Sequence, residues 1–87
     1  MKGIYKYQLE VKEEQELNIT GLPEYLSIQM QAGRIVFWAY VDCDEEERPI
    51  TFKIVGTGMP FEDRPNWFYL GTVQHNGYVW HVFSKLN

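Results

Sequence analysis

Residues 25–41 read YLSIQMQAGRIVFWAYV. Two runs of alternating apolar and polar residues flank Ala32-Gly33, a pattern that predicts two antiparallel strands joined by a two-residue hairpin turn. Counting outward from the turn sets the register, because side chains of paired strands alternate together between the two faces. One face is apolar and is predicted to belong to the core; its pairs are Met30 with Ile35, Ile28 with Phe37, and Leu26 with Ala39.

The opposite face of this hairpin mixes large aromatic residues with amides and a hydroxyl. Such a mixture is poorly explained as ordinary solvent-exposed surface, so we expect part of it to contact a partner. The predicted pairs on this face are Gln31 with Arg34, Gln29 with Val36, Ser27 with Trp38, and Tyr25 with Tyr40.

Period-two alternation continues over the rest of the chain. Asn76-Gly77 predicts a second hairpin, with Val73 opposite Trp80, Thr72 opposite His81, Gly71 opposite Val82 and Leu70 opposite Phe83. Further strands are predicted over residues 5–11, 17–19 and 50–55, and no segment has a helical pattern. We therefore predict a single all-β domain over residues 1–87, a small antiparallel sandwich or open barrel of six to seven strands.

Two acidic segments are predicted to connect strands, Glu13–Glu16 and Asp42–Pro49. The second carries Asp42, Asp44 and three consecutive glutamates, which raises the question of a cation site. The spacing departs from an EF-hand loop, which needs a glycine at its sixth position and a glutamate at its twelfth. We interpret the segment as a solvated loop and expect no metal.

Composition limits the classes of partner. The net charge is −4 and the eight lysines and arginines are scattered singly along the chain. Duplex nucleic acid is not expected to bind, because its affinity comes from clustered cations. A small ligand with a few phosphates stays open, since one arginine and a few amides can hold it. Aromatic residues make up 16 % of the chain, which favours a partner surface or a homo-oligomer.

The single cysteine, Cys43, cannot form an intrachain disulfide and suits a reducing cytoplasm. The N-terminal residues lack the apolar run of a signal peptide, and no window is long enough to cross a bilayer. We therefore expect a cytoplasmic protein that has no membrane contact and no cofactor.

The segment Ile54-Val-Gly-Thr-Gly-Met-Pro60 ends a β-branched strand in a glycine turn. Two glycines can take positive φ and point successive amides at one anion. The hydroxyl of Thr57 adds a donor, and Arg64 could fold back over a phosphate. The alternative is structural, because glycine at the end of a strand also supplies backbone angles that other residues do not reach.

His81 is predicted to lie opposite Thr72 as a histidine bonded to a hydroxyl, since no triad spacing accompanies it. Tryptophan and tyrosine rings exceed what one small core encloses, so some are expected to stack on a nucleobase or to line an interface. The candidate ligand-binding residues are Gly56, Thr57, Gly58, Arg64, Trp38, Tyr40, Arg34, Trp80 and His81.

The whole chain resembles a family of short uncharacterised proteins found in phages and prophage-bearing bacteria. The resemblance lies in Ile4-Tyr-Lys-Tyr7, Ser27-Ile-Gln-Met-Gln31, Trp38-Ala-Tyr-Val-Asp42, Phe52–Pro60, Tyr69-Leu-Gly-Thr72 and His81-Val-Phe83. It carries no established activity and implies an accessory factor that acts on host defence.

Two functions follow as hypotheses. In the first, the chain sequesters a nucleotide immune signal, with Gly56–Gly58 and Arg64 or Arg34 on phosphate and Trp38, Tyr40 or Trp80 on a base. In the second, an aromatic face docks on a host or phage protein and inhibits or scaffolds it. An enzyme ranks third, because the sequence shows no paired catalytic groups.

Overall fold

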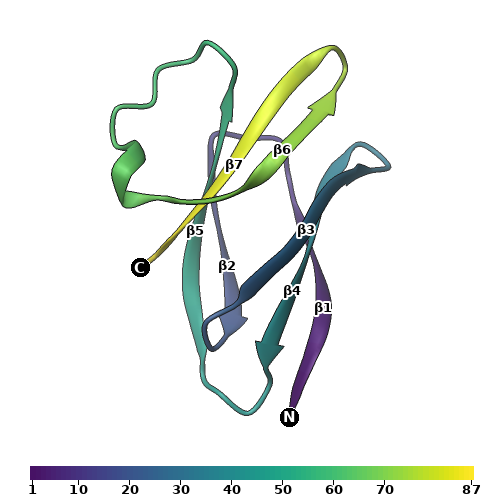
Figure 1. Cartoon of the computed structure of the whole chain (residues 1–87), viewed down its shortest axis with the longest axis vertical. Coiled ribbons are helices and arrows are strands. Elements are labelled where there is room, and N and C mark those ends of the chain that lie inside the picture. The colour runs from purple at the N-terminus through teal and green to yellow at the C-terminus, as the bar shows by residue number, and fades with distance from the viewer.

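The computed structural model describes residues 1–87 as seven strands in two antiparallel sheets (Figure 1). The three-stranded sheet has the order β1-β4-β3, and the four-stranded sheet has the order β2-β5-β7-β6. The all-β prediction is confirmed, and of its two forms the sandwich is the one observed. The strands are β1 (Lys2–Leu9), β2 (Glu14–Thr20), β3 (Glu24–Gln31), β4 (Arg34–Asp42), β5 (Glu47–Gly56), β6 (Phe68–His75) and β7 (Tyr78–Leu86).

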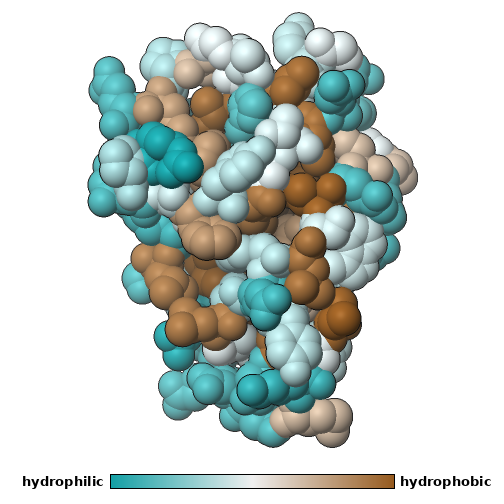
Figure 2. All heavy atoms as spheres, viewed as in Figure 1, coloured by the Kyte–Doolittle hydropathy of each residue, from teal (hydrophilic) through white to brown (hydrophobic).

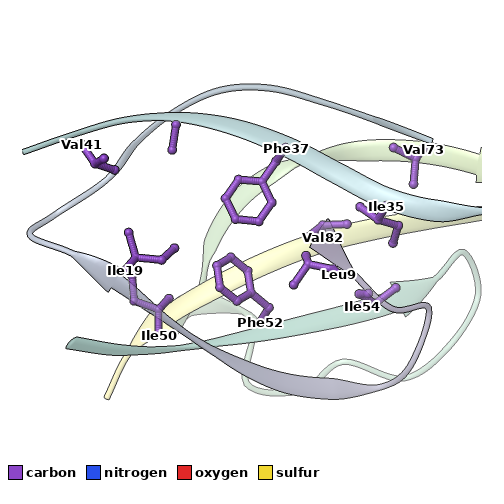
Figure 3. Close-up of a cluster of buried hydrophobic side chains, with 11 residues drawn as sticks. Leu9, Ile19, Ile35, Phe37, Val41, Ile50, Phe52, Ile54, Val73 and Val82 are labelled. Atoms are coloured by element: carbon purple, nitrogen blue, oxygen red, sulfur yellow. The ribbon is translucent and has the colours of Figure 1, made fainter. Parts of the chain in front are cut away.

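The core lies between the two sheets. Phe37 from β4 and Phe52 from β5 meet near its centre, with ring centroids 5.2 Å apart (Figure 3). The inward side chains of each strand alternate with outward ones, as period-two patterning predicts. The buried cluster comprises Leu9, Ile19, Ile35, Phe37, Ala39, Val41, Ile50, Phe52, Ile54, Val73 and Val82.

Both predicted two-residue turns are present. Ala32 and Gly33 have φ of 50° and 78°, and Asn76 and Gly77 have φ of 53° and 80°. Positive φ at both central residues defines a type I′ turn, whose twist matches that of the strands it joins. These turns place β3 beside β4 and β6 beside β7.

The register of the first hairpin is as predicted from the turn as far as Ser27, which pairs with Trp38. A β-bulge then shifts the pairing, so the predicted pairs of Leu26 with Ala39 and of Tyr25 with Tyr40 are wrong. Tyr25 pairs with Ala39 instead, and Glu24 pairs with Tyr40. The extra residue in the bulge is Leu26, which is exposed rather than part of the core.

A second bulge interrupts β6. Thr72 pairs with His81 as predicted, but the predicted pair of Leu70 with Phe83 is wrong, because Tyr69 takes the position opposite Phe83. The bulged strands β3 and β6 are edges of different sheets, and they run side by side (Figure 1). Bulges bend and twist an edge strand, which lets these two edges approach each other.

The connections formed by the two acidic segments, Glu13–Glu16 and Asp42–Pro49, are shorter than predicted. Glu14–Glu16 belongs to β2, and Glu47–Pro49 begins β5. The carboxylates of Glu13 and Glu14 lie 3.8 Å and 4.0 Å from the Lys53 ammonium on β5. Pairing with a neighbouring strand therefore extends regular structure into residues whose side chains alone suggested a loop.

A long loop between β5 and β6 covers part of the outer side of the four-stranded sheet. Trp67, near its end, is buried against Val55 and Phe83, and Phe61 packs onto the same cluster. Its one helical element is the three-residue 3-10 helix Arg64–Asn66. No helix of this structure has the length or the apolar content to cross a bilayer.

Candidate functional site

The outer face of the three-stranded sheet, here called the β4 face, gathers polar, cationic and aromatic side chains. Strand β4 is central, so its outward residues are flanked on both sides by those of β1 and β3. The face consists of Lys2, Ile4, Lys6 and Gln8 from β1, Arg34, Val36, Trp38, Tyr40 and Asp42 from β4, and Glu24, Ser27, Gln29 and Gln31 from β3.

Two cations lie near Val36, toward the end of this face that is next to the β3–β4 turn. The Lys6 ammonium donates to Oε1 of Gln31 at 3.3 Å, and Nη1 of Arg34 donates to Oε1 of Gln8 at 3.3 Å. The first bond crosses β4 from β1 to β3 over Val36, and the second runs from β4 to Gln8, the residue of β1 that pairs with Val36. They explain why Val36, an outward residue, is only 1 % exposed.

Neither Lys6 nor Arg34 forms an ion pair with a carboxylate, although Glu10 and Glu16 line the same hollow as Arg34. Four of the eight lysines and arginines form ion pairs, namely Lys12, Arg48, Lys53 and Lys85. The other four are Lys2, Lys6, Arg34 and Arg64, and three of these lie on the β4 face. Two like charges held only by neutral amides repel each other and attract an anion.

Aromatic rings stand next to these cations. Trp38 is partly exposed, with Lys6 on one side and Ser27 on the other. Tyr40 is 41 % exposed, and its neighbour Ile4 is 61 % exposed. The face therefore runs from a cationic end at Arg34 to an aromatic and apolar end at Tyr40.

The glycine turn after β5 uses most of its own amides. The Thr57 amide donates to the carbonyl of Val79 at 3.1 Å, and the Met59 amide donates to the carbonyl of Gly56 at 3.0 Å. The Gly56 amide is 3.3 Å from the Met59 sulfur. Gly58, at φ of 90°, keeps the one amide of the turn without a partner. A single unpaired backbone amide would bind phosphate only weakly.

A hollow of about 380 Å³ lies beside this turn. Tyr78 and Trp80 line it, with ring centroids 5.7 Å apart, and Met59 closes one side. The indole nitrogen of Trp80 is buried without a hydrogen-bond partner. No lysine or arginine lines the hollow, so it offers flat surface without charge.

His81 on β7 contacts hydroxyls from β6 and from the turn that follows β5. Its Nε2 lies 2.7 Å from Oγ1 of Thr57, and its Nδ1 lies 2.9 Å from Oγ1 of Thr72. Thr72 in turn shares a short hydrogen bond with the hydroxyl of Tyr69. Both ring nitrogens are therefore engaged, and no carboxylate is part of this chain of contacts.

Arg64 does not fold back over the glycine turn. Its Nη1 donates to the carbonyl of Trp67 at 3.0 Å, and its guanidinium lies 4.9 Å from the Phe83 ring centroid. These contacts keep it on the outer side of the four-stranded sheet. Arg64 is therefore part of the covering loop described above.

The candidate residues from the sequence fall into separate places. Arg34, Trp38 and Tyr40 share the β4 face. The others belong to the four-stranded sheet or its loop, with Trp80 packed toward the core; they are Gly56, Thr57, Gly58, Arg64, Trp80 and His81. Since the outer faces of a sandwich point away from each other, one chain does not unite all nine in a single site.

Sequence reasoning missed Lys6 and Gln8 as members of the site, and it placed Gln31 on this face without naming it as a candidate ligand-binding residue. Their alternation in the sequence was visible, but the pairing of β1 with β4 joins residues 26 or more positions apart. Neither hairpin turn sets that register. A count of outward-facing cations per strand is the signal that points to them.

A second surface is apolar. A hollow of about 270 Å³ opens where β3 and the C-terminal part of β7 meet the β2–β3 connection, lined by Leu22, Tyr25, Phe68 and Leu86 among others. Leu22 is 66 % exposed and Phe68 is 62 % exposed. Figure 2 shows hydrophobic side chains reaching the surface in this region of the molecule.

The fold and the β4 face define a small antiparallel β-sandwich with a cationic and aromatic sheet surface. A family model described as a domain of unknown function, DUF7352, matches residues 1–87. The chain therefore belongs to that family. No curated protein and no solved structure matches it.

Proposed function

We propose that this protein binds a phosphate-bearing nucleotide on the β4 face. One observation supports the proposal above all others: Lys6 and Arg34 converge over Val36 with no carboxylate partner, in a chain of net charge −4. Cations that an acidic protein leaves uncompensated are a natural site for an anionic ligand. The partly exposed ring of Trp38 beside them supplies a stacking surface for the base.

The donors suit a phosphate. Arg34 uses one of its five N–H groups on Gln8, and Lys6 uses one of three on Gln31. The remaining donors can bind phosphate oxygens while the glutamines keep both side chains in place. Trp38 lies two residues along β4 from Val36, about 7 Å away, a span that a ribose between phosphate and base can bridge.

The finer form of the proposal draws on the resemblance to phage proteins. In that setting the chain retains a nucleotide immune signal in the host cytoplasm without altering it. A homo-oligomer would present one β4 face per copy. The covalent state of a nucleotide recovered after incubation distinguishes retention from catalysis, since an enzyme would return it changed.

The test is a thermal shift and calorimetric titration with AMP, cyclic nucleotides and ADP-ribose. A ligand at 100 times its Kd adds about 2.7 kcal/mol to the free energy of unfolding, which for a chain of this size raises Tm by about 10 to 20 °C. Lys6→Gln and Arg34→Gln should each weaken binding about tenfold or more, because each removes a charge-assisted hydrogen bond.

Lys85→Gln is the matched control, since Lys85 lies on β7 of the other sheet and forms an ion pair with Asp63. It removes the same charge from the chain and should leave the affinity within about twofold of the original. Equal losses in all three variants would attribute binding to net charge alone and contradict the proposed site. No shift with any nucleotide would contradict the function.

Docking of another polypeptide is the second candidate function, and the apolar hollow at Leu22 and Phe68 favours it. The expected occupant is an apolar segment of a partner protein, because the lining is mainly hydrophobic. Under this function Leu22→Asp would abolish capture of the partner and Trp38→Ala would not. The opposite result would assign the partner to the β4 face.

A further inference from the structure

We infer that the ligand of the β4 face carries two bases, as a dinucleotide or a short stretch of single strand does. The inference depends on the proposed function and names its ligand class. Its basis is a second exposed ring, Tyr40, on the same strand and face as Trp38. A mononucleotide with its base on Trp38 leaves that ring unused.

The spacing of the two rings fits two bases. Trp38 and Tyr40 are alternate residues of β4, so their side chains emerge about 7 Å apart on one face. Bases stacked in a regular helix rise by about 3.4 Å per nucleotide. The rings are therefore placed for bases that are separated from each other, the state in which single strands are bound on sheet surfaces.

The neighbours of the rings differ in hydrogen-bonding character. Ser27 lies beside Trp38 and offers a hydroxyl that both donates and accepts. Glu24 lies beside Tyr40 and offers only acceptors. A carboxylate accepts from an exocyclic amino group, so the position on Tyr40 should favour adenine, cytosine or guanine over uracil, which lacks that group and has only its ring N3–H to donate.

Acidic residues limit the length of the ligand. Beyond Tyr40 the face ends in a hollow of about 280 Å³, whose lining includes three carboxylates, Glu24, Asp42 and Glu45, and two cations, Lys2 and Arg48. A further phosphate there would meet more negative than positive charge. The cations that remain for phosphate are those at the other end, so the site accommodates about two nucleotides.

The experiment compares AMP with the 5′-phosphorylated dinucleotides pApA and pUpU by calorimetry on the intact chain. Because stacking on an aromatic side chain strengthens binding about 5- to 150-fold per base, pApA should bind about tenfold or more tighter than AMP. Tyr40→Ala should bring the ratio of the two affinities close to one. Tyr78→Ala, which removes an exposed ring at the β6–β7 turn, should preserve the ratio.

Equal affinities for AMP and pApA in the unaltered chain would overturn this inference and leave the proposed function standing. A ratio that Tyr40→Ala does not reduce would also overturn it. Binding of neither ligand would overturn both. pUpU should bind more weakly than pApA, and Glu24→Gln should narrow that difference; pUpU binding as tightly as pApA would contradict the assignment of Glu24.

Discussion

Replacing Gly71 by alanine tests the contact between the two bulged edge strands. A Cβ on Gly71 would overlap the Cγ2 methyl of Ile28 on β3. Ile28 packs against the core from its other side, so it has little room to retreat. Overpacking of this kind typically costs about 1–3 kcal/mol.

That cost is large for this chain. A domain of 87 residues has a free energy of unfolding of about 4–13 kcal/mol. Since each kcal/mol changes Tm by about 4–8 °C in a domain of this size, Gly71→Ala should lower Tm by about 5–20 °C. Urea unfolding followed by tryptophan fluorescence gives the free energy, and thermal unfolding followed by circular dichroism gives Tm.

A double-mutant cycle with Ile28→Ala assigns the cost to the contact. Because Ile28→Ala removes the overlapping methyl, Gly71→Ala should cost about 1 kcal/mol less in that background than alone. Gly77→Ala is the control, because Gly77 has φ of 80° and open space around it. The substitution therefore introduces backbone strain without a new side-chain contact, and its cost should not depend on Ile28. Two results would refute this account of the contact between β3 and β6. One is an unchanged urea midpoint for Gly71→Ala, and the other is a loss of unfolding free energy from Gly71→Ala that is the same in the Ile28→Ala background.

Two further predictions concern titration. Burial raises the pKa of Tyr25 and that of Tyr7 above their ordinary value of 10.0, so the folded chain holds these protons more tightly than the unfolded chain does. The free energy of unfolding should therefore fall as the pH rises above about 10, and Tyr25→Phe should flatten that fall; urea midpoints that stay constant across this range would contradict it. The side-chain hydrogen bond from Asn66, with smaller help from Trp67 and Lys85, lowers the pKa of Asp63 below its ordinary value of 3.8. This stabilisation is present above that value and is lost as the pH falls through the lower folded-state pKa. Asp63→Asn should lower Tm at neutral pH and reduce the loss of Tm on acidification, and a variant that loses as much Tm in acid as the original chain would count against the prediction.

The strands themselves were predictable from local pattern. Alternation in Ile50, Phe52 and Ile54 identified the inward face of β5, and the structure buries all three. Both two-residue turns were also predictable from Asn76-Gly77 and Ala32-Gly33, and in the structure all four residues have positive φ. These features depend on residues close in sequence, where the physical constraint acts within a few bonds.

The failures were all of longer range. Leu26 was assigned to the core because it continued the count from the turn, but the bulge reverses its side. A bulge depends on how an edge strand meets its neighbour across the sandwich, here Ile28 over Gly71. The alternation of apolar and polar residues along one strand does not reveal this contact between the two sheets.

By itself the sequence determined an acidic, aromatic-rich chain of antiparallel strands with two tight turns, since side-chain period and turn chemistry are local properties. Only the tertiary structure decided which cations would be neighbours. Lys6 and Arg34 are scattered single charges in the sequence, yet the pairing of β1 with β4 brings them together over Val36. The physical reason is that the pairing of strands far apart in sequence is selected by burial of the opposite, apolar face, and the polar face takes whatever arrangement that burial imposes.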